Sequence, residues 1–337
     1  QLQGRFPGTE GANLAADYIE QYFKNIGLTA YANSYRQQLD VTTSVSATEK
    51  NNVSFDQLIE RLGIPESEWR TMKQNWTNGK EYVPLAFSDN GSCSGDIVFA
   101  GFGITANELN YDDYKDVDVK GKIVVVLSNT PDGESDKGDF SFYSSLRYKA
   151  SNAAKKGAVG MILVKIQGDS MNVFERLEYS NIGKNTGIIA IQAHRQSISK
   201  FFAKDKQLVI LEQQIMKTKQ PASYQLPRVT ANITVDLKDN EVPTYNIFGI
   251  VEGTDSKLKD EYIVIGAHYD HLGWGGYNSL YRGKKAMVHN GADDNASGVS
   301  AMMEIATEIK NNPLKRSVIF VAFTAEEMGL LGSEHFV

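Results

Sequence analysis

The stretch Ser317-Val-Ile-Phe-Val-Ala-Phe323 is apolar at every position after its first residue, and it runs directly into Thr324-Ala-Glu326-Glu327. A strand that is apolar on both faces is typical of the middle of a sheet that helices cover on both sides. The side chains of two adjacent glutamates must diverge, so one could bind a cation while the other faces a reacting water molecule. A solvated acidic turn would have the same sequence, and this motif alone favours that turn.

Two further motifs precede it. Gly266-Ala-His268-Tyr-Asp270-His271 ends another apolar run, and strand alternation places His268 and Asp270 on one face. A metal-bound imidazole needs its second nitrogen held by a carboxylate or carbonyl, which Asp270 could supply. Gly291-Ala-Asp293-Asp294-Asn295-Ala-Ser-Gly298 forms a turn before a predicted helix over 296–310, where adjacent carboxylates repel one another unless a cation or the helix N-terminus offsets their charge. Taken singly, the first motif fits a packed or solvated histidine better than a metal ligand, and the second fits plain N-capping better.

Read together, the three motifs are more specific. Each follows an apolar strand or precedes a helix, so all should gather at the carboxyl edge of one sheet, where α/β folds bind ligands. The sequence has no His-Glu-x-x-His, no Gly-x-Ser-x-Gly, no P-loop and no Gly-x-Gly-x-x-Gly. Imidazole and carboxylate donors suit Zn²⁺ or a similar divalent ion.

The rest of the chain predicts alternating helices and strands. Apolar residues recur at helical spacing over 10–27, and 54–77 is interpreted as a second helical unit. Two β-branched runs, 121–127 and 159–164, predict strands. We also expect a hairpin joining the apolar runs 246–251 and 262–267 across a polar turn.

Composition restricts the class of protein. The 337 residues are 41% hydrophobic, enough for a large core and about two domains. No apolar run reaches 18 residues, which predicts no membrane span. The net charge of -6, without a basic stripe, argues against nucleic acid as a partner. Cys93 is the only cysteine, so neither an intrachain disulfide nor a cysteine-based zinc site can form.

On its three motifs, and on Pro7-Gly-Thr-Glu-Gly11 with the helix that follows, the chain resembles the M28 zinc aminopeptidases. Val119-Lys-Gly-Lys-Ile-Val-Val-Val126 and the segment 153–164 resemble a protease-associated (PA) domain. The resemblance implies an α/β fold: a mixed, mostly parallel sheet flanked by helices, of the zinc-exopeptidase (phosphorylase/hydrolase-like) type, with an inserted small α/β PA domain. The expected domains are a catalytic domain over 1–44 and 222–337, a helical insertion over 45–82 and the PA domain over 83–221.

The resemblance also implies roles for individual residues. His268 would bind one zinc ion, Glu327 the second, and Asp294 would bridge both, with a cis peptide to the asparagine that follows it. Glu326 would be the general base that takes a proton from a water bridging the two Zn²⁺ ions, and Asp270 would orient the site. The implied activity is a co-catalytic dizinc exopeptidase that removes N-terminal residues from peptide substrates, in an exported protein (periplasmic, cell-surface or secreted).

One departure from the family pattern leaves alternatives open. Family members supply a further Asp and His after the Glu-Glu motif, whereas only Met328 to Val337 follow it here. We therefore expect a chain truncated at its C-terminus, in which each metal lacks one ligand and which is inactive on its own. An M28-type carboxypeptidase, a glutaminyl cyclase-like enzyme and an inactive, metal-poor binding relative are the other readings. Residue preference is expected to depend on loops such as 274–284.

Overall fold

The computed structural model describes residues 2–135, 137–168, 174–175, 177, 186–275, 279, 281 and 285–337. Residues 276–278, 280 and 282–284 of the loop expected to set residue preference lie outside these ranges. The chain forms two compact units. The terminal unit contains residues 1–45 and 239–337, and the central unit contains most of residues 46–238.

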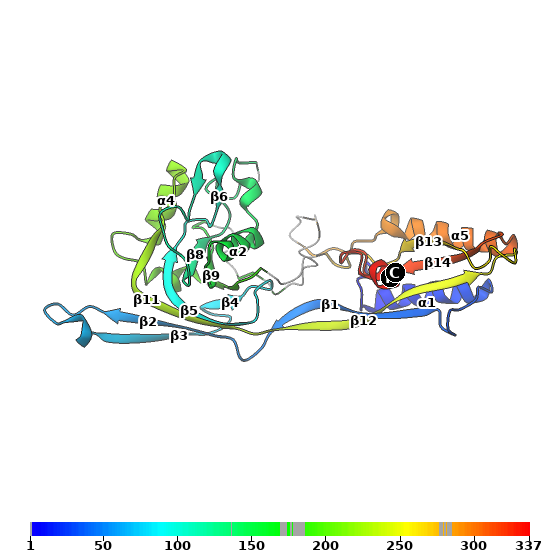
Figure 1. The fold of residues 1–337 in the computed structure, drawn as a ribbon, viewed down its shortest axis with the longest axis horizontal. Helices are drawn as coiled ribbons and strands as arrows, with labels where there is room; N and C mark the ends of the chain where they lie inside the picture. The colour runs from blue at the N-terminus through cyan, green and yellow to red at the C-terminus, as the bar shows by residue number, and fades with distance from the viewer. Residues whose placement is uncertain are drawn as a thin grey trace. The chain divides into compact units, whose positions relative to one another are not determined.

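The terminal unit is built on a four-stranded mixed sheet (Figure 1). Across the sheet, the strands are β1 (Arg36–Ala47), β12 (Leu237–Val251), β14 (Ser317–Phe323) and β13 (Tyr262–His268). β14 pairs antiparallel with β12 and parallel with β13. The mixed α/β class and the inner position of β14 are therefore confirmed. The expected hairpin is wrong, because β14, which is apolar on both faces, lies between β12 and β13 and separates them.

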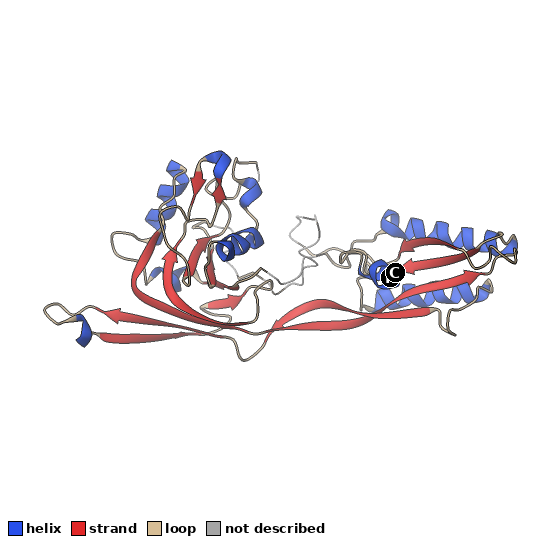
Figure 2. Ribbon diagram, viewed as in Figure 1, coloured by secondary structure: helices blue, strands red, loops and turns tan. Residues whose placement is uncertain are grey.

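In the described part of this unit the α-helices are α1 (Glu10–Asn25), α5 (Gly298–Asn311) and α6 (Leu331–Phe336) (Figure 2). The helix predicted over 10–27 is confirmed. It begins after Thr9, whose side chain accepts from the N–H of Ala12, and the left-handed φ of Gly27 (75°) follows its last turn. α1 and α5 share one core with the sheet, in which Phe23 and Phe320 are fully buried. Burying each such ring stabilises the fold by roughly 1.5–3 kcal/mol.

The central unit contains an eight-stranded sheet. Its strands, in order across the sheet, are β3 (Arg70–Trp76), β2 (Asn52–Ile59), β11 (Tyr224–Val235), β5 (Gly91–Phe99), β8 (Ile123–Leu127), β9 (Gly160–Val164), β10 (Ile189–Ala193) and β4 (Tyr82–Pro84). β6 (Thr105–Ala106) and β7 (Tyr111–Asp112) form a small separate pair, and the helices are α2 (Leu146–Lys155), α3 (Arg195–Ser199) and α4 (Leu208–Thr218).

The two β-branched runs were predicted correctly. Every residue of β8 and β9 is buried, and the two strands pair in parallel. The helical unit expected over 54–77, and with it the helical insertion over 45–82, is wrong, because these residues form β2 and β3 of the same sheet. Pairing with β11 buries Phe55, which stacks on Phe201 at 4.6 Å between ring centroids. No helix in the described part of the chain is long and apolar enough to cross a membrane.

Candidate metal centre

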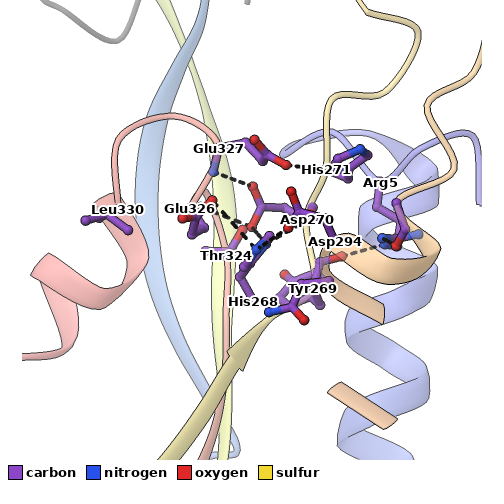
Figure 3. A network of polar contacts seen from close by, with 12 residues as sticks. Arg5, His268, Tyr269, Asp270, His271, Asp294, Thr324, Glu326, Glu327 and Leu330 are labelled. Carbon is purple, nitrogen blue, oxygen red and sulfur yellow. Dashed lines mark hydrogen bonds and ion pairs between the residues drawn. The ribbon is translucent and has the colours of Figure 1, made fainter. Parts of the chain in front are cut away.

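The three sequence motifs meet at one edge of the four-stranded sheet. His268 ends β13, and its register partner Phe323 ends β14, immediately before the Glu326-Glu327 turn. Asp294 lies in the turn that leads into α5. Figure 3 shows these side chains directed toward one another. The prediction that the three motifs gather at the carboxyl edge of one sheet is therefore confirmed.

His268 faces two acidic side chains. Its Nε2 lies 3.0 Å from Asp294 Oδ1 and 3.7 Å from Glu326 Oε2. Its Nδ1 lies 3.2 Å from the main-chain oxygen of Asp270, which holds the ring and directs Nε2 toward the acids. Burial lowers the pKa of His268, but Asp270 and Glu326 outweigh it and raise that pKa to about 9. Nε2 of His268 is thus placed where a bound cation would take the position of the proton on that nitrogen.

His271 also lies near Asp294. Its Nδ1 lies 2.5 Å from Glu327 Oε1, and one donor atom each from His271, Asp294 and Glu327 lie within 4.8 Å of one another. Burial raises the pKa of Glu327, His271 opposes this rise, and the charges of Asp294 and Asp270 add to it. The sequence analysis assigned no role to His271. The available signal was a second histidine placed directly after His268-Tyr-Asp270.

Asp270 acts on the glutamate turn. Its carboxylate is fully buried and accepts from the main-chain N–H of Glu326 (3.1 Å) and of Glu327 (3.3 Å). Ala325, just before, has a left-handed φ of 51°. Asp270 therefore fixes the backbone that carries both glutamates, in addition to holding His268 through its own carbonyl.

Arg5 links two of the motif segments through hydrogen bonds. The sequence alone did not identify this residue. Its Nε donates to the carbonyl of Tyr269 at 2.6 Å, and its Nη1 and Nη2 donate to those of Asn290 and Gly291 at 2.8 Å each. Gly291 has a φ of 55°, and a side chain there would meet Arg5 Nη2 at 2.7 Å. One buried guanidinium thus fixes both the end of β13 and the turn that carries Asp294.

The donor set fits a divalent cation. Imidazole nitrogens and carboxylate oxygens are the ligands that Zn²⁺ takes when no thiolate is present. Asp294 Oδ1 lies 3.0 Å from His268 Nε2, a donor oxygen of Asp294 lies within 4.8 Å of a ring nitrogen of His271, and the Asp294 side chain is 66% exposed to solvent. The peptide bond from Asp294 to Asn295 is cis, as the resemblance implied. Asp294 can therefore bind a metal ion together with either histidine.

Family models match two parts of the chain. Residues 246–337 match "Peptidase family M28", and residues 83–196 match "PA domain". The two matched segments are thus similar to peptidase family M28 and to the PA domain, in agreement with the resemblance seen in the sequence motifs. Because the PA match lies within the central unit, the PA domain is inserted between the two parts of the terminal unit, which carries the M28 residues.

Individual M28 relatives are distant and longer than this chain. "Aminopeptidase YwaD" of Bacillus subtilis (strain 168) is 24% identical over 295 residues, which cover 86% of this chain and 50% of that protein. A "Glutamate carboxypeptidase 2 homolog" of Caenorhabditis elegans is 23% identical, covering 75% of this chain and 36% of its own length. The chain thus spans half or less of these curated relatives.

Among solved structures, two aminopeptidases align with most of the chain. The aminopeptidase from Aneurinibacillus sp. strain AM-1 is 21% identical with a TM-score of 0.46, and covers 99% of this chain and 63% of its own. The zinc aminopeptidase BSAP from Bacillus subtilis is 20% identical with a TM-score of 0.45, and covers 99% and 61%.

Proposed function

We propose that this chain carries the catalytic side chains of a zinc-dependent exopeptidase that removes N-terminal residues from peptides. The observation that carries the proposal is that Asp294 lies 3.0 Å from His268 Nε2 and that its donor oxygen lies within 4.8 Å of donor atoms of His271 and Glu327. The relative from Bacillus subtilis is an aminopeptidase, which supports the same interpretation.

In this proposal Asp294 and His268 hold one zinc ion, and Asp294 and Glu327 hold a second. Bound divalent cations polarise a carbonyl oxygen and lower the pKa of water, which supplies a nucleophile at neutral pH. The fold of the chain brings these nitrogen and oxygen donors together at one edge of the sheet. The backbone contacts of Arg5 and Asp270 keep them there.

Glu326 is proposed as the general base. Its side chain is 36% exposed, so water and substrate can reach it, and its Oε2 is 3.7 Å from His268 Nε2. It would accept a proton from the attacking water and then donate it to the amine that leaves, a role typically worth about 10²–10⁴ in rate. Asp270 keeps Glu326 in place by accepting its main-chain N–H.

A carboxypeptidase is the second candidate, because one relative is named a glutamate carboxypeptidase 2 homolog. The two activities differ in which end of the peptide must be free. Export of the protein rests on the family resemblance alone, and fractionation of cells that express the native gene would test it.

The deciding experiment uses the full-length protein. It should release p-nitroaniline from aminoacyl-p-nitroanilides, lose this activity when a chelator removes metal, and regain it with Zn²⁺. The matched N-acetylated anilides should remain uncut. Cleavage of N-blocked peptides with free C-termini, in place of the anilides, would favour the carboxypeptidase. Hydrolysis that persists after complete metal removal would overturn both.

A further inference from the structure

We propose that Asn246 is a positioning residue that holds the glutamate loop, residues 324–332, which carries Glu326 and Glu327. Its amide joins the two ends of this loop to each other and to strand β12. The inference deepens the proposed function and rests on it, because Glu326 and Glu327 are the side chains that the proposed reaction uses. Asn246 is fully buried, so it would act through the loop and not on the substrate.

The side chain of Asn246 has hydrogen-bond partners on three sides. Its Oδ1 accepts from the main-chain N–H of Thr324 at 3.1 Å. Its Nδ2 donates to the main-chain carbonyl of Gly332 at 2.7 Å and to Gln37 Oε1 at 2.9 Å. Because the first partner can only donate and the second can only accept, the orientation of the amide is fixed. One side chain thus holds the first residue of the loop and the first turn of α6 together.

The ladder between β12 and β14 ends where the contact with Asn246 begins. Its last register pair is Ile247 with Ala322. One residue earlier in β12, the Asn246 side chain takes over from the main chain and accepts the N–H of Thr324. Figure 3 shows Thr324 close to Glu326, where the chain leaves the sheet. The chain can therefore leave the sheet at this point without a buried, unpaired N–H.

The backbone of the glutamate loop needs such a contact. Two residues in it that carry side chains, Ala325 and Leu330, have left-handed φ angles of 51° and 64°. Conformations of this kind persist only where the surrounding structure holds them. The two ends of the loop also leave no space between them, because a Cβ on Gly332 would lie 2.1 Å from the carbonyl oxygen of Thr324 and 2.6 Å from Asn246 Oδ1. The loop is thus closed at its ends beside the Asn246 amide.

Apolar packing by itself accounts for less of the arrangement. The buried side chains of Ala325 and Met328 share a cluster with Leu39 and Val41 of β1, which keeps the loop against the sheet. Apolar contacts have no preferred direction, so they do not aim the carboxylates. Catalytic side chains must be held within about 0.5 Å of their productive positions. The directional hydrogen bonds of Asn246 supply that constraint.

The test compares Asn246→Ala with Ser317→Ala in full-length protein. Ser317 is buried at the start of β14, the opposite end from the loop, where its hydroxyl donates to the carbonyl of Lys259 at 2.5 Å and accepts the N–H of Gly253 at 3.0 Å. Both variants therefore lose buried hydrogen bonds in the same unit. In chelator, hydrogen exchange followed by mass spectrometry should show loss of protection over 324–332 in Asn246→Ala and wild-type protection there in Ser317→Ala.

Zinc binding and kinetics give the second measurement. Removing a residue that supports metal-binding side chains typically weakens metal affinity by roughly 10–100-fold. Displacing catalytic groups by about 1 Å can lower the rate by about 10². We expect Asn246→Ala to weaken Zn²⁺ binding and, at saturating Zn²⁺, to lower kcat by these factors while KM changes little. Ser317→Ala should keep the wild-type values.

A second variant, Asn246→Asp, keeps the size of the side chain and the bond to Thr324, so it leaves no cavity if Asn246→Ala fails to fold. A carboxyl group offers at most one donor, whereas the amide has two, so at least one contact of Nδ2 is lost whether the carboxyl is protonated or ionised. Its kcat should lie below the wild-type value and above that of any folded Asn246→Ala.

The outcomes separate the two proposals. Loss of loop protection and of Zn²⁺ affinity in a folded Asn246 variant, with neither loss in Ser317→Ala, supports the positioning role. If the folded variants keep wild-type protection over 324–332 and wild-type Zn²⁺ affinity, Asn246 only stabilises the unit and the inference is overturned. Equal losses in Ser317→Ala overturn it as well. If Asn246→Ala shows both losses but the wild-type protein cuts neither anilides nor peptides, the proposed function fails while the positioning role stands.

Discussion

The guanidinium of Arg5 donates from Nε to the main-chain carbonyl of Tyr269 over 2.6 Å, although 264 positions separate the two residues in the sequence. Tyr269 lies between His268 and Asp270, so this bond fixes the backbone at the centre of the first motif. The other two guanidinium contacts fix the turn that carries Asp294. Residues from the two ends of the chain thus share one site.

Replacing Arg5 by Lys should therefore impair the site without unfolding the protein. A lysine ammonium is a point charge and cannot span three carbonyls arranged for a planar guanidinium. A shift of about 1 Å in the donors can lower the rate by about 10². We expect kcat to fall by about this factor and Zn²⁺ affinity to fall with it, while KM changes little. Arg36→Lys is the control, because Arg36 pairs with Glu20 and Asp17 away from the site. Equal kcat values in both variants would contradict the positioning role.

Glu326→Gln should separate catalysis from metal binding. The amide cannot accept the proton of the attacking water, so kcat should fall by about 10²–10⁴. Zinc content per chain, measured on the same sample, should stay at the wild-type value. Glu327→Gln should instead lose metal, because it removes a charged donor. A Glu326→Gln enzyme with wild-type kcat would remove Glu326 from the mechanism.

Asp270→Asn should destabilise the metal-free protein. The carboxylate accepts two main-chain N–H groups, whereas an amide offers one oxygen and turns an NH₂ group toward the second donor. A buried donor left without an acceptor costs about 1–3 kcal/mol in the free energy of unfolding. Urea unfolding in chelator measures this, with Glu304→Gln on the exposed side of α5 as control. An unchanged midpoint would show that these two hydrogen bonds do not stabilise the turn.

The central unit carries a pair of buried ionisable groups that should make its stability depend on pH. Lys149 Nζ donates to the carbonyls of Phe102, Leu127 and Asn129. Burial lowers the pKa of Lys149 from 10.5 to about 7, and the charge of Asp113 opposes this shift. Between pH 7 and 10.5 the unfolded chain therefore binds a proton that the folded chain does not. The free energy of unfolding should rise with pH across this window.

At lower pH, Asp113 makes the free energy of unfolding change with pH in the opposite direction. Burial raises its pKa from 3.8 to about 7, although Lys149 and the N–H groups of Phe102 and Ile104 oppose the rise. Between pH 3.8 and 7 the folded chain keeps a proton that the unfolded chain loses, so stability should fall as pH rises. Urea unfolding of the whole chain from pH 4 to 10 should show a minimum near pH 7. The double variant Asp113→Asn/Lys149→Met should lack it, and a minimum that persists in this variant would assign it to other groups.

Elements specified by local pattern were predictable. The run 317–323 reads as an inner strand because both of its faces are apolar, and 10–27 reads as a helix because apolar residues recur along one side. The strands β8 and β9 follow from β-branched runs in the same way. Periodicity failed for 54–77, because the pairing of β2 with β11 joins residues far apart in sequence and leaves little local signal. It failed again for the expected hairpin, since the strand that separates β12 from β13 comes later in the chain.

For the site, the sequence by itself determined which groups are available: His268, Asp270, Asp294 and the glutamate pair, in three ordered motifs that resemble those of the M28 family. Only the tertiary structure decided how these groups combine. It placed Asp294 against His268, brought His271 to Glu327 and Arg5 to Gly291. The physical reason is that coordination and hydrogen bonding depend on distances of a few ångströms between segments that sequence spacing leaves unrelated. Those distances exist only once β13, β14 and the turn before α5 share one sheet edge.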